Sequence, residues 1–116
     1  MESASRVEKI YRRARYLMFG PFLSPARRVA RAEKKIHRGK FEDALRMLVG
    51  LLNKGIDPAL KPAVFLALAE AETGCGNLGN ARYYARQCEA ALEGEEHAGS
   101  DSDAMLERAR EIQAPA

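Results

Sequence analysis

The stretch Gly39-Lys-Phe-Glu-Asp-Ala-Leu45 returns in altered form 37 residues later as Gly76-Asn-Leu-Gly-Asn-Ala81. Sliding the chain on itself by 37 residues gives seven identities in a window of twenty. The identities pair Pro25 with Pro62, Ala26 with Ala63, Ala30 with Ala67, Ala32 with Ala69, Glu33 with Glu70, Gly39 with Gly76 and Ala44 with Ala81. Prolines at helix starts, alanines where helices approach closely and glycines at turns indicate a repeated helix hairpin.

Helix start and stop signals around this repeat predict six helices. They span about 5–19, 25–38, 41–53, 59–74, 77–93 and 102–113. Ser24-Pro25 and Asp57-Pro58 each combine a capping side chain with a proline suited to the first helical position. In the last helix, the spacing places Met105, Ala109 and Ile112 on the inward face.

Length and composition favour one small helical domain. The chain has 116 residues, of which 20 are Ala and 12 are Leu, and an all-β domain is excluded. About 65% of the unfolded chain's surface can be buried at this size, so neither a metal nor a disulfide is required for folding. The longest apolar run, 16–23, is too short for a membrane span or a signal peptide, which predicts a cytoplasmic location.

The two halves of the chain differ in charge. Residues 1–54 hold 14 basic and 5 acidic side chains, whereas residues 55–116 hold 5 basic and 11 acidic ones. Such polarity affects association and steering rather than the fold. Self-pairing of the two halves is one alternative, but we expect a monomer because exposed ion pairs contribute only about 0–1 kcal/mol each.

The repeated strings resemble the turn and early second helix of tetratricopeptide (TPR) units, in which Gly-x-aromatic/Leu-x-x-Ala joins helix A to helix B. Ala32 and Ala69 match the small residue in the middle of helix A. Phe65 matches the large residue near its start, although the first copy has Arg28 there. The resemblance covers roughly 24–93, and its spacing of 37 residues exceeds the usual 34 or so.

The resemblance implies an all-α, TPR-like array of antiparallel helix hairpins, forming a single domain over 1–116. Its parts are a basic amphipathic helix within 1–23, a first hairpin over 24–58, a second over 59–93 and a capping helix over 100–113. The N-terminal helix is expected to cover the open end of the array, with docking on a membrane or a partner as the alternative. A generic helical bundle is the alternative to a TPR-like array.

Side chains suited to catalysis or metal binding are few. His37 and His97 have no Cys or carboxylate at ligand spacing, which disfavours zinc. Cys75 and Cys88 are expected about 16 Å apart along the hairpin, too far for a disulfide, so both are predicted to be free thiols. The chain is therefore expected to be non-enzymatic, without a cofactor or a metal.

The TPR resemblance also implies a concave groove, lined by the A helices, that holds a peptide or a helix of a partner protein. The positions that match the groove are Ala26, Val29, Glu33, Ile36 and His37 in the first unit, and Ala63, Leu66, Glu70 and Thr73 in the second. Some TPR domains clamp a C-terminal carboxylate with an amide where this chain has glutamates, so that clamp is expected to be absent. The leading expectation is a protein-interaction module, an adaptor or a small chaperone-like protein.

A basic stripe supports a second hypothesis. Its members recur at helical spacing, with two flanking residues: Arg27, Arg31, Lys34 and Arg38, flanked by Arg28 and Lys35. With Arg12, Arg13 and Arg15 they could bind phosphates of RNA or an acidic membrane surface. A solvated helix face is the alternative. The sequence leaves the identity of the partner open.

Overall fold

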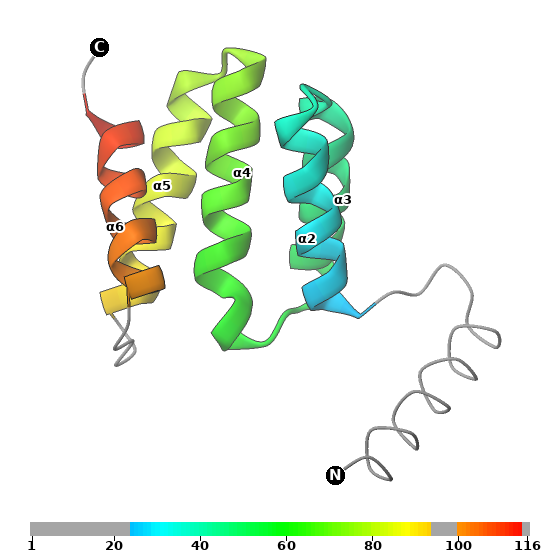
Figure 1. The fold of residues 1–116 in the computed structure, drawn as a ribbon, viewed down its shortest axis with the longest axis horizontal. Helices are drawn as coiled ribbons and strands as arrows, with labels where there is room; N and C mark the ends of the chain where they lie inside the picture. Colours follow the sequence, from blue (N-terminus) through cyan, green and yellow to red (C-terminus); the bar gives the residue numbers. More distant parts are fainter. Residues whose placement is uncertain (1–23, 94–99, 115–116) are drawn as a thin grey trace, which may run out of the picture.

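All the regular secondary structure among the described residues is helical. A computed structural model describes residues 24–93 and 100–114 (Figure 1). Its elements are α2 (Pro25–His37), α3 (Phe41–Lys54), a 3-10 turn η1 (Pro58–Leu60), α4 (Lys61–Cys75), α5 (Leu78–Glu93) and α6 (Ser100–Gln113). The all-α class is confirmed, while the helix expected at 5–19 lies outside the described residues. None of the described helices is long and apolar enough to cross a bilayer.

Each hairpin has one turn between its helices, and the two turns have the same backbone geometry. Gly39 and Gly76 both adopt positive φ, 78° and 83°, a conformation that only glycine takes without strain. The residue after each glycine donates its backbone N–H to the carbonyl five residues earlier: Lys40 to Lys35 at 2.8 Å and Asn77 to Glu72 at 2.9 Å. These bonds satisfy carbonyls at the helix ends. The 37-residue repeat therefore has a counterpart in backbone geometry.

The start of α4 differs from the prediction. Asp57 caps a 3-10 turn, through a bond from the Ala59 N–H to its Oδ1 at 3.0 Å, and the α-helix begins only at Lys61. Proline has no N–H and its ring clashes with the carbonyl four residues earlier, so Pro62 is tolerated only in the first turn of a helix. A helix that began near residue 59 would place Pro62 beyond that turn.

The helices form two layers (Figure 1). Helices α2, α4 and α6 lie side by side in one layer, and α3 and α5 lie behind them. Each consecutive pair is in contact, and α4 also contacts α2 and α6. α4 therefore packs against each of the other four helices.

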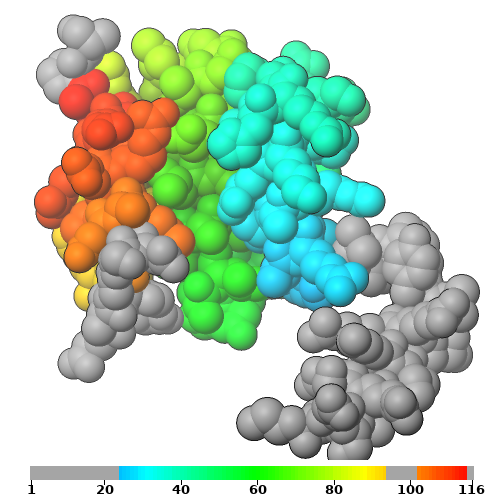
Figure 2. Space-filling view, in the orientation of Figure 1, coloured from blue at the N-terminus to red at the C-terminus, as the bar shows by residue number. Residues whose placement is uncertain are grey.

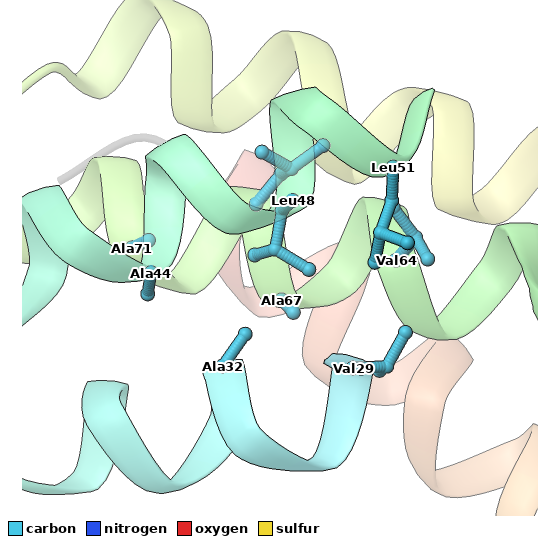
Figure 3. Close-up of a cluster of buried hydrophobic side chains, with 9 residues drawn as sticks. Val29, Ala32, Ala44, Leu48, Leu51, Val64, Ala67 and Ala71 are labelled. Carbon is cyan, nitrogen blue, oxygen red and sulfur yellow. The ribbon is translucent and has the colours of Figure 1, made fainter. Parts of the chain in front are cut away.

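Two apolar clusters meet at α4. The first lies between α2, α3 and α4 and contains Val29, Ala32, Ala44, Leu48, Leu51, Val64, Ala67, Leu68 and Ala71 (Figure 3). The second lies between α4, α5 and α6 and contains Ala69, Ala85, Cys88, Leu92 and Ala109. As predicted, Met105 and Ile112 pack beside Ala109. Because α4 supplies both clusters, it is apolar around most of its circumference.

The 37-residue offset also relates the buried positions. Four pairs of equivalent residues are buried: Ala32 and Ala69, Ala44 and Ala81, Leu48 and Ala85, and Leu51 and Cys88. Equivalent positions thus face the interior in both hairpins. The two units therefore bury equivalent positions, although the side chains at two of the four pairs differ.

Gly74 in α4 lies directly against the ring of Phe41 in α3. A Cβ atom built on Gly74 overlaps the ring of Phe41, whereas one built on Gly50, inside α3, meets nothing within 4 Å. Alanine is favoured over glycine in a helix by about 1 kcal/mol, but overpacking costs about 1–3 kcal/mol. We expect Gly74→Ala to lower the free energy of unfolding and Gly50→Ala to raise it.

Urea unfolding followed by circular dichroism measures both changes. In a Phe41→Leu background, Gly74→Ala should lose its penalty and approach the behaviour of Gly50→Ala. An unchanged penalty in that background would show that the ring of Phe41 is not its cause.

Candidate functional site

A groove opens on the face that α2, α4 and α6 share (Figure 2). Its volume is about 350 Å³. The lining residues are Glu33, Ile36 and His37 from α2, Ala63, Leu66, Ala67 and Glu70 from α4, and Met105 and Arg108 from α6. The floor is apolar, and the charged groups stand among the lining residues of all three helices. This combination suits an apolar side chain with polar groups beside it.

Six of the nine predicted groove residues line this groove, and three do not. Val29 is only 4% exposed and belongs to the first apolar cluster, so its assignment to the groove was wrong. Val29, Ala32 and Ile36 follow the helical spacing that faces α3 and α4, which explains its burial. Ala26 is exposed in the first turn of α2, and Thr73 donates its hydroxyl to the Ala69 carbonyl at 2.8 Å.

The third wall of the groove was not predicted. Helix α6 contributes Met105 and Arg108. The Nε of Arg108 donates to the Oε1 of Glu70, and its Nη1 bonds to Glu111 at 3.0 Å. Glu70 is therefore neutralised by an ion pair, and the groove is less acidic than the two glutamates alone suggested. The helical spacing of Met105, Ala109 and Ile112 predicted which face of α6 points inward, but it did not predict that Arg108 would reach Glu70.

Glu33 carries the remaining acidic charge of the groove. Partial burial raises the pKa of its carboxyl above the ordinary value of 4.5, and the charge of His37, one turn along α2, opposes that rise. Among the described residues, no ion pair to Glu33 is formed. A cation placed beside Glu33 would stabilise its ionised form.

A second hollow lies between α2 and α3, with a volume of about 780 Å³. Nine described residues line it, and seven of them are basic: Arg28, Arg31, Lys34, Lys35, Arg38, Lys40 and Arg46, beside Asp43 and Met47. Asp43 lies 3.9 Å from the Nζ of Lys35. The described lining therefore carries one carboxylate among seven cationic groups, and its net charge is strongly positive. We call this surface the basic hollow.

Five of the six residues predicted for an anion patch line the basic hollow, and Arg27 does not. Lys40 and Arg46 were missed because the prediction followed a stripe on one helix. The turn at Gly39 brings α3 alongside α2, and Arg46 thereby joins the arginines of α2. Arg12, Arg13 and Arg15 lie outside the described residues.

Both cysteines are free thiols, as predicted. Cys88 is fully buried in the second apolar cluster, and burial raises the pKa of its thiol to about 11. Such a thiol stays protonated near neutral pH, so Cys88 serves to fill the core. Within residues 24–93 and 100–114, no group of three or more His, Cys, Asp or Glu side chains is placed to hold a metal ion.

No protein-family model matches the sequence, and no curated protein and no solved structure matches it. The function must therefore be inferred from the groove and the basic hollow themselves.

Proposed function

We propose that the chain is a non-enzymatic, TPR-like interaction module that holds a segment of a partner protein in the groove between α2, α4 and α6. The observation that carries this proposal is the composition of the groove: Ile36, Leu66 and Met105 offer an apolar surface beside the charge of Glu33. An adaptor or a small chaperone-like protein would use such a site to hold its partner. The repeated turns and the equivalent buried positions support the TPR-like reading.

The size of the groove favours a short peptide over a whole helix as its occupant. A volume of about 350 Å³ is near the lower end for ligand pockets. It accommodates one large apolar side chain with its neighbours, in the manner of an anchor. Because Glu70 already pairs with Arg108, the charge open to a ligand is that of Glu33. The preferred segment therefore has an apolar anchor next to a lysine or arginine.

Selection from a display library of random short peptides tests this proposal. Peptides selected on the full chain should carry an apolar residue beside a basic one. Glu33→Lys should weaken their binding by tenfold or more, about 1.4 kcal/mol, because a favourable charge pair becomes repulsive. The ion pair of Glu70 is left intact by this variant. Ala63→Tyr, which fills the groove, should abolish binding, and circular dichroism should show that the variant remains helical.

The pH dependence of binding gives a second readout. Desolvation raises the pKa of Glu33 in the free chain, so Glu33 must release a proton when a basic peptide binds at a pH near or below that pKa. Affinity should therefore fall as the pH falls through that raised pKa. In Glu33→Gln this loss of affinity at low pH should disappear, except for any part caused by titration of the peptide itself. If the selected peptides bind Glu33→Lys and Ala63→Tyr as tightly as the unchanged chain, the groove is not their binding site.

A further inference from the structure

We propose that the basic hollow between α2 and α3 binds the phosphate backbone of a nucleic-acid duplex. Seven lysine and arginine side chains line it, with one carboxylate among them. Four of the seven are arginines, whose planar guanidinium groups donate paired hydrogen bonds to phosphate oxygens. The groove proposed for peptides lies on another flank of α2, so the two sites are separate.

Three of these cations stand at positions that are apolar in the second unit of the repeat. At the 37-residue offset, Arg28, Arg31 and Lys34 stand where the second unit has Phe65, Leu68 and Ala71. Leu68 and Ala71 are fully buried, and Phe65 packs beside them against the first hairpin. The face that docks onto a preceding hairpin in the second unit is thus basic in the first.

The need for solubility alone does not explain why the charges of the basic hollow are almost all positive. An exposed face needs polar residues, and interspersed acidic and basic residues provide them without mutual repulsion. Here like charges stand together in a concavity, where they repel and focus the field. An anionic ligand relieves that repulsion.

The shape and charge density favour a duplex over other polyanions. From Arg28 to Arg38 the basic residues run along about 15 Å of α2, and Lys40 and Arg46 add cations from the facing side. A duplex carries one charge per roughly 1.7 Å of axis, about twice the density of a fully acidic extended peptide. None of the described residues that line the hollow is aromatic, so these residues offer single strands no base stacking. A flat membrane surface does not enter a concavity.

The test measures the affinity of the full chain for a short mixed-sequence duplex, as RNA and as DNA, between about 50 and 200 mM salt. Arg31→Gln, Arg38→Gln and Arg46→Gln combined should weaken binding at least about tenfold at the lower salt and reduce the salt slope by up to about 2.7. All three side chains are exposed, so folding should be retained. The matched control combines Lys61→Gln, Arg82→Gln and Arg86→Gln, with the same net charge, and should change affinity by less than about threefold.

Several outcomes would overturn the proposal. Equal losses in the two triple variants would mean that net charge alone attracts the duplex. No measurable duplex binding, or tighter binding of polyglutamate or of phosphatidylserine vesicles through the same arginines, would reject a nucleic-acid backbone as the ligand. Ala63→Tyr should leave duplex binding unchanged, which separates this test from that of the peptide groove.

Discussion

Leu68→Ala should lower the free energy of unfolding by about 2–5 kcal/mol, because it removes a fully buried side chain from the helix that all the others contact. A domain of this size is stable by only about 5–15 kcal/mol, so the substitution removes a large share of the total. Urea unfolding followed by circular dichroism gives the measurement. Leu78→Ala is the matched control, since Leu78 is 49% exposed and its truncation should change stability by no more than about 0.5 kcal/mol.

Equal shifts for the two leucine variants would contradict the packing around α4. A large shift for Leu68→Ala and a small one for Leu78→Ala would support it. The comparison holds the chemical change constant and varies only the burial.

Ala44→Leu and Ala81→Leu should each cost about 1–3 kcal/mol through overpacking. The two alanines are 0% and 1% exposed and stand at equivalent positions, five residues after the turn glycines. We expect each to lie where the second helix of a hairpin crosses the first, so that a larger side chain there would force the helices apart. Chemical unfolding of each variant gives the cost.

Exposed alanines on the same two hairpins provide the controls. Ala30→Leu and Ala90→Leu introduce the same side chain on the solvent side of α2 and α5, and should change stability by no more than about 0.5 kcal/mol. If the buried and exposed substitutions have the same effect, the repeat does not place Ala44 and Ala81 at helix crossings.

Most of the fold could be predicted because its signals are local. Ser24, for example, accepts a bond from the Arg27 N–H at 3.4 Å, and Gly76 adopts the left-handed conformation that ends α4. Caps, prolines and glycines affect the backbone within a few residues, so their effects can be predicted from the sequence alone. The start of α4 was misplaced because two such signals, Asp57-Pro58 and Pro62, compete four residues apart.

The sites were predicted only in part because they depend on contacts between distant residues. The pairing of Glu70 with Arg108 joins positions 38 residues apart and arises from the packing of α6 against α4. Helical periodicity describes one helix at a time, so it identified the arginines of α2 and missed Arg46 on α3. Val29 was misassigned for a related reason, since groove and core positions lie side by side on α2.

The position of α4 in both apolar clusters ties the two hairpins into one cooperative unit. The first cluster needs α4 as well as α2 and α3, and the second needs α4 as well as α5 and α6, so displacing α4 would remove packing partners from both. In stacked helix hairpins, the interfaces between neighbouring units add to the intrinsic stability of each unit. A peptide held between α2, α4 and α6 would contact both hairpins at once, and its binding free energy would add to the stability of the whole unit. We therefore expect all the described helices to unfold together at a higher urea concentration when a peptide occupies the groove.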